Sequence, residues 1–426
     1  MSTAPLRFSG TARRTGDSPI SYYVQKALET PGLISLAAGL VDESHFPVAD
    51  IREAMNDILG EAKSAKAALQ YGSTSGLPAL REQCLKRVCH ADGTTPEALN
   101  LTVNNVLLTT GSQQMLYLLG EILFDPGDIV LCEGPSYFVY HGVLQSQGVK
   151  VITVPMDAGG MDLNALEATL THLQSTGQIE RVKLIYTVDY FQNPTGLSLA
   201  AERRPKLVDI ARRFSTGHRI LVLADSAYRE LRYDGPDLPG LKSFDPSNEF
   251  VIYTTTFSKP CAPGLKTGYS ILPHELVAPV ANLKGSHDFG STNLVQHILT
   301  RLIASGAYDR HIVSLREVYR TKRDAMLTAL SNEFGDWPEV TWTKPGGGMY
   351  VWMTFPKHFR TGKGGALIER ALKNGVLYIP GELGYRPGDD GIVPTNEIRL
   401  SFGVSEPDTI REGVRRLRAA CRGLEA

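Results

Sequence analysis

The chain has 426 residues, of which 42% are hydrophobic and 21% charged, and its net charge is −1. These values are typical of a globular protein with two or three domains and a large buried core. The near-zero charge provides no global attraction to nucleic acid or to an anionic membrane, and no apolar run reaches membrane-spanning length. We therefore expect neither a nucleic-acid-binding protein nor a membrane protein.

The five cysteines and ten histidines are scattered and form no paired-ligand pattern. Scattered thiols in odd number favour a reduced, cytoplasmic protein, and the sequence has no metal-binding signature. It also has neither GxxxxGK[ST] nor GxGxxG after a strand, so nucleotide-dependent chemistry has no support. The N-terminal residues lack the apolar core of a secretory signal. Arg7, Arg13 and Arg14 favour a basic arm, with a transit peptide as the alternative.

The chain is predicted to have three parts. Residues 1–50 have no core of their own and are expected to form an arm that packs on the small domain and the active site. Residues 51–305 are predicted to form an α/β domain with a mostly parallel central sheet flanked by helices, because residues from about 100 to 275 alternate β-branched runs with amphipathic stretches such as Gln113–Phe124. The strand candidates are Val106–Thr110, Ile129–Glu133, Val151–Val154, Val182–Val188, Ile220–Asp225 and Val251–Phe257.

Residues 306–426 show a different pattern and are predicted to form a smaller α+β domain. A long helix, Tyr308–Phe334, begins it, and a last helix begins near Ser405 with Asp408 as its capping partner. The strand candidates between them are Val340–Thr343, Met349–Phe355, Val376–Ile379 and Ile398–Phe402.

Polar residues stand where several predicted strands end: Gly111-Ser112, Asn193, Asp225 and Ser258-Lys259. Ligands bind at the carboxyl ends of strands in such sheets, so we expect these residues to meet at one site. Lys259 lies in TTTFSKPCAPGLKTGY, where a buried lysine with a lowered pKa would condense with an aldehyde. Thr256, Ser258 and Lys266 would then bind a phosphate. The alternative is a solvated surface lysine.

Each neighbouring motif has two interpretations. Gly111-Ser112-Gln113 is either an anion site at a helix N-terminus or a plain cap by Ser112. Tyr137, in CEGPSYF, either stacks on a planar ring or is a core or surface tyrosine. Asn193, in YFQNPTG, either forms a turn only or also donates to a phenolic oxygen.

Two charged residues lie in apolar strands, where an unpaired charge is costly. Asp225 ends RILVLAD and is either a loop or capping carboxylate, or the partner of a protonated pyridine nitrogen. Tyr228 is spaced to reach the same ligand. Arg399, in NEIRLSF, either forms an internal salt bridge or binds a carboxylate with both prongs of its guanidinium.

Together these residues resemble the fold-type I, class I/II aminotransferases that use pyridoxal 5′-phosphate (PLP). The resemblance runs from ISLAAGL, residues 34–40, to IRLSF, residues 398–402. Four segments are similar to the aminoadipate and kynurenine aminotransferase subgroup: QYGSTSGLPALR, TTGSQQ, FQNPTG and GVLYIPGE.

The resemblance implies a role for each residue. Lys259 would hold the cofactor aldehyde as a Schiff base and move the substrate proton, and Asp225 would pair with the pyridine nitrogen. Arg399 would bind the substrate α-carboxylate, and Gly39 would line the substrate pocket. Tyr71 would reach the phosphate of the neighbouring subunit in a homodimer with shared sites. The other cofactor contacts would be Gly111, Ser112, Gln113, Tyr137, Asn193, Tyr228, Thr256, Ser258 and Lys266, with Asn193 also touching the substrate.

Three departures from the family pattern carry expectations. Lys266 stands where the family usually has arginine, so phosphate affinity should be weaker. Asp189-Tyr190 replaces a frequent Pro-Asp and should alter the edge of the pocket. Ser21 replaces a frequent arginine, which disfavours acidic substrate side chains, while Tyr22 and Tyr23 would favour aromatic or aliphatic ones.

The reaction implied is transfer of an amino group from an L-amino acid to a 2-oxo acid, usually 2-oxoglutarate, by a ping-pong mechanism. The amino acid would be aromatic, aliphatic or aminoadipate-like. The same scaffold supports β-elimination, decarboxylation or oxidation, and these remain the alternatives. A regulator that joins a DNA-binding module to this domain would need about a hundred more basic, helical residues before Asp50. A non-catalytic relative is disfavoured by the retention of Lys259, Asp225 and Arg399.

Overall fold

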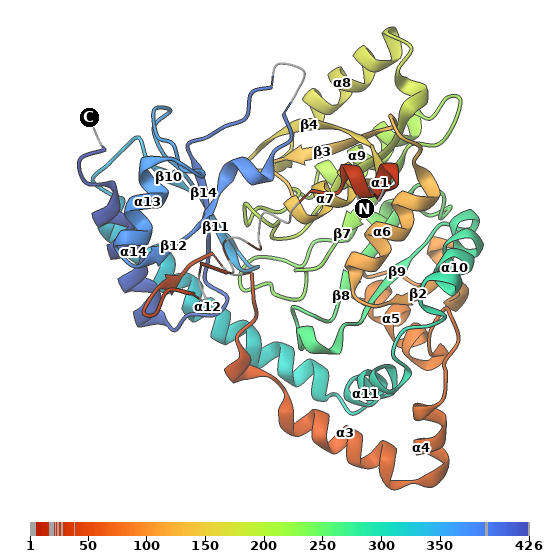
Figure 1. Ribbon diagram of the computed structural model, residues 1–426. Helices are drawn as coiled ribbons and strands as arrows, with labels where there is room; N and C mark the ends of the chain where they lie inside the picture. Colours follow the sequence, from red (N-terminus) through yellow and green to blue (C-terminus); the bar gives the residue numbers. More distant parts are fainter. Residues whose placement is uncertain are drawn as a thin grey trace, which may run out of the picture.

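The structure is a computed structural model that describes residues 6–16, 21, 23, 25–26, 29–37, 39–387 and 391–424. An eight-stranded sheet forms the centre of its larger part (Figure 1). In spatial order, its strands are β2 (Val106–Thr109), β9 (Gly268–Ile271), β8 (Val251–Thr256), β7 (Leu221–Asp225), β6 (Val182–Thr187), β3 (Ile129–Gly134), β4 (Lys150–Asp157) and β5 (Gly160–Met161).

The sheet is mostly parallel, as predicted, and each of the six predicted strands is present. Strands β4, β3, β6, β7 and β8 pair in parallel, whereas β9 runs antiparallel to both β2 and β8. Sequence analysis missed β9, because it has only four residues and opens with a glycine. The connection between β8 and β9 lies at the edge of the sheet where β8 ends, so Lys266 and Lys259 lie at the same edge.

Both faces of the sheet are buried, because alternate residues of each strand enter different apolar clusters. In β7, Leu223 packs in the cluster that contains α6, while Val222 packs in the cluster that contains α8 and α9. The helices of this larger part are α3 (Val48–Gly60), α4 (Ala62–Leu69), α5 (Pro78–Ala91), α6 (Ser112–Leu123), α7 (Phe138–Gln147), α8 (Leu163–Ser175), α9 (Arg203–Phe214), α10 (His274–Asp288) and α11 (Asn293–Ala304).

A second, antiparallel sheet lies in the smaller part, to the left in Figure 1. Its strands, in spatial order, are β10 (Thr341–Trp342), β11 (Tyr350–Thr354), β14 (Glu397–Ser401) and β13 (Ile379–Pro380). The long α12 (Ala307–Phe334) runs from beside α11 to α14 (Pro407–Cys421), and α13 (Ala366–Lys373) packs on α14. The predicted cap of the last helix is wrong: Glu406 is the N-cap residue, no side chain caps the helix, and Pro407 occupies the first helical position.

The N-terminal arm contacts both parts. Strand β1 (Ile34–Ser35) pairs in parallel with β12 (Val376–Leu377), and α1 (Gly10–Arg14) lies beside α7, where Arg14 Nε donates to the Ser146 carbonyl at 3.0 Å. The division at residues 50/51 and 305/306 stays a prediction. In the described part of the chain, no helix combines the length and the apolar character needed to cross a bilayer.

Candidate active site

One cavity of about 230 Å³ opens at the carboxyl ends of the parallel strands. It gathers eleven of the predicted site residues: Gly111, Ser112, Gln113, Tyr137, Asn193, Asp225, Tyr228, Thr256, Ser258, Lys259 and Lys266. Thr110, Val188, Ala227 and Pro263 complete its lining and were not predicted. A larger cavity of about 610 Å³ lies along β4 and α8 and includes none of the predicted residues. We place the site by its chemistry rather than by its volume.

Lys259 follows β8 and reaches across to the N-terminal arm. Its Nζ is half-buried and donates a hydrogen bond to the Gly39 carbonyl at 2.8 Å. Gly39 lacks a side chain where one would not fit, since a Cβ there would lie 2.7 Å from the Tyr350 hydroxyl oxygen. The two predicted residues therefore meet although 220 positions separate them.

Asp225 ends β7 as a buried carboxylate with one unsatisfied oxygen. Its residue is 4% exposed, and the Tyr186 hydroxyl donates to Oδ2 at 3.1 Å. The buried Oδ1 has no hydrogen-bond partner among the described residues. Burial raises the pKa of Asp225 to about 7, against the opposing effect of the Tyr186 hydrogen bond. No helix begins after Asp225, so the capping interpretation does not apply.

The N-terminus of α6 points its free backbone N–H groups at the same cavity. Its N-cap is Gly111, at φ 73°, and no side chain caps the helix, so the interpretation of Ser112 as a cap is wrong. Ser112 is instead the first helical residue. Gly268 in β9 lets this helix approach closely, because a Cβ there would lie 2.6 Å from the Ser112 nitrogen.

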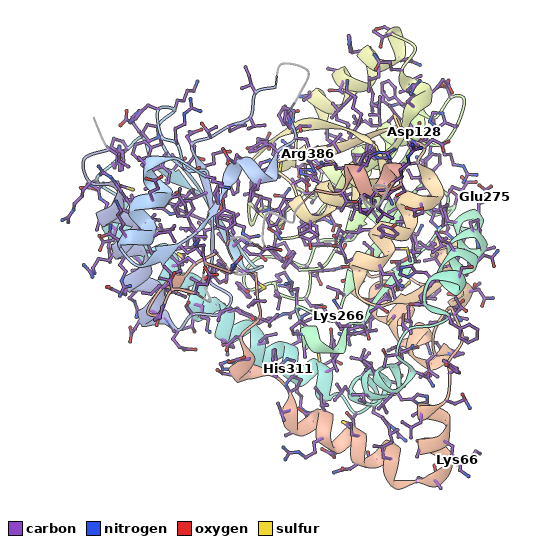
Figure 2. All side chains as sticks on the ribbon, in the orientation of Figure 1. Lys66, Asp128, Lys266, Glu275, His311 and Arg386 are labelled. Carbon is purple, nitrogen blue, oxygen red and sulfur yellow. The ribbon has the colours of Figure 1, made fainter. Side chains whose placement is uncertain are left out.

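Two hydroxyls and a cation stand opposite this helix end. Thr256 Oγ1 donates to Ser258 Oγ at 2.9 Å, which fixes the two hydroxyls side by side. Lys266, labelled in Figure 2, is exposed, and its backbone adopts the left-handed conformation at φ 44°. Within the described ranges it has neither an ion pair nor a hydrogen bond from its side chain. A free ammonium, two hydroxyls and a helix N-terminus together form an anion site.

Arg399 lies on β14 and contacts the opposite side of the cavity through Asn193. It is 1% exposed; its Nη1 donates to Asn193 Oδ1 at 2.8 Å and its Nη2 donates to the Ala37 carbonyl at 2.7 Å. No carboxylate in the described part of the chain pairs with it, so the internal salt bridge is wrong, and its buried Nε has no hydrogen-bond partner there. Its positive charge remains available to an anion.

Tyr137 and Gln113 form a further wall of the cavity. Tyr137 is the N-cap residue of α7, its ring is half-buried, and its hydroxyl donates weakly to Gln113 Oε1 at 3.5 Å. It is therefore neither a core nor a free surface tyrosine. Sequence analysis missed two tyrosines of this region, Tyr186 and Tyr350. Both lie in apolar strands, and only the strand register shows which face they take.

Tyr71 does not reach the cavity of its own chain. It is 82% exposed, and its ring meets the edge of Phe289, itself 60% exposed, at a centroid distance of 5.5 Å. Exposed aromatic pairs of this kind mark interaction surfaces.

Of the tyrosines expected to select substrates, Tyr23 is buried in the main apolar core and Tyr22 lies outside the described residues.

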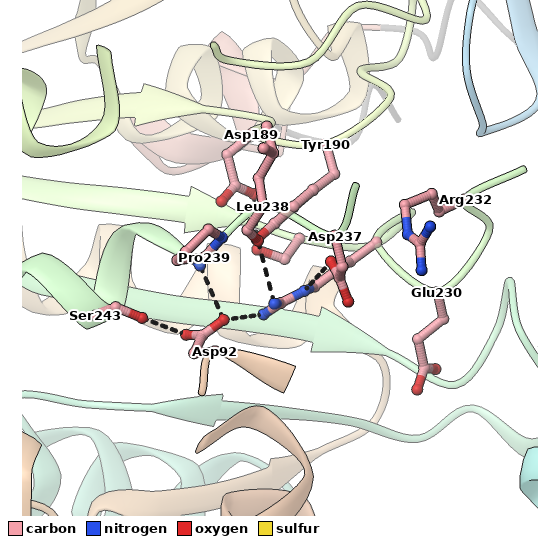
Figure 3. A network of polar contacts seen from close by, with 12 residues as sticks. Asp92, Asp189, Tyr190, Glu230, Arg232, Asp237, Leu238, Pro239 and Ser243 are labelled. Atoms are coloured by element: carbon pink, nitrogen blue, oxygen red, sulfur yellow. Dashed lines mark hydrogen bonds and ion pairs between the residues drawn. The ribbon is translucent and has the colours of Figure 1, made fainter. Parts of the chain in front are cut away.

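Asp189 and Tyr190 do not form the edge of the cavity, which corrects that expectation. Both are buried in a polar network (Figure 3). Asp189 accepts from Ser226 Oγ at 2.7 Å and pairs with Arg204 at 3.2 Å, both side chains being 0% exposed. The guanidinium carbons of Arg204 and Arg229 lie 4.2 and 5.0 Å from the centre of the Tyr190 ring. The pair thus anchors Ser226, the residue that follows Asp225.

We expect Arg204→Ala to destabilise the fold by about 3–5 kcal/mol, because Asp189 would keep a buried charge without a partner. Three backbone carbonyls would also lose their donor. The shift of the thermal midpoint of the full chain measures this. Arg213→Ala, which removes exposed ion pairs on α9, should leave the midpoint nearly unchanged. Equal shifts for the two variants would contradict the expectation.

The chain is similar to proteins of one known family. Residues 31–417 match the model of the family described as aminotransferase class I and II. The chain is 34% identical to aromatic-amino-acid aminotransferase 1 of Thermococcus litoralis over 394 residues, which covers 92% of this chain and 88% of that protein.

Two solved structures extend the match to three dimensions. One is the kynurenine aminotransferase of Pyrococcus horikoshii in complex with PMP, with TM-score 0.87, 34% identity and coverage of 97% and 96% of the two chains. The other is LysN, the alpha-aminoadipate aminotransferase of Thermus thermophilus, complexed with N-(5′-phosphopyridoxyl)-L-leucine, with TM-score 0.83, 33% identity and coverage of 98% and 97%. With its sheet, its cavity and its sequence in agreement, this chain belongs to the class I and II aminotransferases.

Proposed function

We propose that this aminotransferase uses PLP to move the amino group of an L-amino acid to a 2-oxo acid by a ping-pong mechanism. The observation that carries the proposal is the placement of the Lys259 amine and the unsatisfied Asp225 carboxylate in one cavity with an anion site. Bound PLP supplies an aldehyde that condenses with amines and a ring that accepts electrons.

The residues of the cavity fit the three functional parts of this cofactor. The buried Oδ1 of Asp225 lacks a donor, and a protonated pyridine nitrogen supplies one. The N-terminus of α6, Thr256, Ser258 and Lys266 suit a phosphate, because they offer N–H groups, hydroxyls and a positive charge. The half-buried ring of Tyr137 suits stacking on a heterocycle.

In the proposed reaction, each residue of the chain has a limited task. Lys259 holds the cofactor and then carries the proton removed from the substrate Cα. Asn193 Oδ1 accepts a hydrogen bond from Arg399, so the amide nitrogen of Asn193 is left to donate to the oxygen on the cofactor ring. Tyr228 contacts the same ring oxygen. Arg399 binds the α-carboxylate, and Gly39 lines the substrate pocket.

The substrates are proposed from the relatives and from the N-terminal arm. Aromatic, aliphatic or aminoadipate-like donors fit the named relatives. Of these, Ser21 favours the aromatic and aliphatic donors, because it offers no charge to an acidic side chain. We propose 2-oxoglutarate as the acceptor. A panel of L-amino acids in single-turnover half reactions, scored by loss of the visible band of the lysine-bound cofactor, identifies the donor.

The overall reaction is tested by stoichiometry. Transamination requires one glutamate for each 2-oxo acid formed when 2-oxoglutarate is the acceptor. Release of pyruvate or ammonia without an acceptor would instead support another PLP reaction, β-elimination or oxidation, and release of carbon dioxide would support decarboxylation.

We also propose a cytoplasmic homodimer with shared active sites. The exposed Tyr71–Phe289 pair supports a contact with a second copy, in which Tyr71 reaches the neighbouring phosphate site. Cys84, Cys89, Cys132 and Cys261 are buried free thiols, which supports a reducing compartment. Sedimentation velocity of the PLP-loaded protein tests the dimer.

We expect Lys266→Arg to tighten PLP binding about 3- to 10-fold, because arginine adds a two-pronged, charge-assisted contact to the phosphate. The dissociation constant from titration of the cofactor-free protein measures this. Lys344→Arg is the control, since Lys344 is not part of the cavity lining. If Lys266→Arg leaves the dissociation constant unchanged, Lys266 does not face the phosphate.

A further inference from the structure

Tyr350 lies beside the proposed carboxylate site but has no role in the reaction described so far. It is the first residue of β11, is 1% exposed, and lies on the same face of the small sheet as Arg399. The register places Arg399 opposite Trp352, so Tyr350 is its diagonal neighbour. The guanidinium carbon of Arg399 lies 4.4 Å from the centre of the Tyr350 ring, which holds the guanidinium in place by a cation–π contact.

The hydroxyl of Tyr350 points to the meeting point of the two parts of the fold. It lies 3.4 Å from the Tyr228 hydroxyl, which lines the cavity. A Cβ on Gly39 would lie 2.7 Å from this hydroxyl oxygen and 3.9 Å from Arg399 Nη2. The Tyr350 hydroxyl, the Arg399 guanidinium and the Gly39 backbone are therefore close neighbours, with no side chain between them.

We propose that Tyr350 is a further substrate-binding residue, whose hydroxyl donates to the α-carboxylate of the amino acid next to Arg399. This assignment rests on the proposed function, because it takes the carboxylate to be bound by Arg399. The assignment adds the Tyr350 hydroxyl, on the small sheet, as a second donor to the substrate carboxylate.

The charges around the hydroxyl favour an anion as its partner. Although burial raises the pKa of Tyr350, the positive charges of Lys259 and Arg399 lower it below its ordinary value. A hydroxyl with a lowered pKa is a stronger donor to a carboxylate. The unsatisfied Nε of Arg399 is further evidence that the guanidinium has capacity for an additional acceptor. The Tyr228 hydroxyl, at 3.4 Å, is too distant to be a strong competing acceptor.

The test is Tyr350→Phe in the PLP-loaded protein, because this change removes the hydroxyl and keeps the ring under Arg399. Three probes share one side chain: L-phenylalanine, 3-phenylpropanoate without the amino group, and 2-phenylethylamine without the carboxylate. We expect the dissociation constants of the first two, measured by calorimetry and by the change of the cofactor band, to rise about 10-fold. The constant of 2-phenylethylamine should be unchanged.

The control is Tyr378→Phe, which removes an equally buried hydroxyl of the smaller part. That hydroxyl donates to the Thr361 carbonyl at 2.8 Å and does not line the cavity. It should leave all three constants unchanged. Unchanged constants in Tyr350→Phe, or an equal loss for 2-phenylethylamine, would overturn the assignment. Failure of the proposed function is distinct: an unmodified protein that does not use PLP would show no cofactor band, and one that carries out another PLP reaction would not form one glutamate for each 2-oxo acid.

Discussion

Lys259→Ala is expected to abolish amino-group transfer and the visible band of the lysine-bound cofactor together. Lys259 is the amine at the centre of the cavity, and its Nζ is placed by the hydrogen bond to the Gly39 carbonyl. Proton transfer by a positioned side chain alone accounts for about 10²–10⁴-fold in rate, and loss of the covalent attachment adds to this. We therefore expect kcat to fall by more than about 10⁴-fold.

The measurement combines spectroscopy with reduction by borohydride. In the unmodified protein, borohydride should remove the band and leave the cofactor on the peptide that contains Lys259. Lys266→Ala is the matched control, because it removes the other cavity lysine, seven residues further along the same loop. It should keep the band and weaken only cofactor affinity. A reducible lysine adduct that persists elsewhere in Lys259→Ala would contradict the assignment.

Asp225→Asn is expected to lower kcat/KM by about 10²–10³-fold, because it removes the negative charge fixed where the pyridine nitrogen lies. The position is buried, and no other carboxylate lines the cavity to replace it. Asp225→Glu keeps the charge but displaces it, and should lose less. Half-reaction rates with the best amino acid of the panel measure both. Similar rates for Asp225→Asn and the unmodified enzyme would show that the ring does not need this charge.

The same substitution has a second effect, on the stability of the cofactor-free protein. Burial raises the pKa of Asp225 to about 7, so the folded state binds a proton that the unfolded chain releases near its ordinary value of 3.8. Ionisation of Asp225 therefore destabilises the folded protein as pH rises from about 4 to about 7, after which the effect is constant.

Because asparagine carries no charge, the cofactor-free variant should exceed the unmodified protein in stability at pH 8, by about 1–3 kcal/mol. The advantage should shrink as the pH falls toward about 5. Thermal midpoints of the two cofactor-free proteins at several pH values measure this difference. Burial also raises the pKa of Glu133 to about 7, but Glu133 is present in both proteins, so its effect cancels from the stability difference. A stability difference that does not change with pH would contradict this expectation. Bound PLP should make the unmodified protein the more stable of the two, because PLP gives Asp225 Oδ1 a donor.

The sequence determined the framework of the large sheet and the chemistry of its edge. Strands such as Val251–Thr256 are short and β-branched, and strand β7 ends in Asp225, so local pattern alone located them. The identity of the site followed from the same principle, because parallel strands end at one edge and carry their terminal residues there. Lys259, Asp225 and Asn193 were predictable for this reason.

Tertiary structure decided what local pattern does not encode. The four-residue strand β9 pairs only because β2 and β8 lie on either side of it, and this pairing brings Lys266 back to the cavity. Asp189 looked like part of the pocket edge, but Arg204 from another helix draws it into a buried pair. Tyr350 and Arg399 become neighbours through strand register, and Gly39 reaches Lys259 across the two parts of the chain. Each of these contacts joins residues distant in sequence, where burial and pairing, rather than local preference, determine the partner.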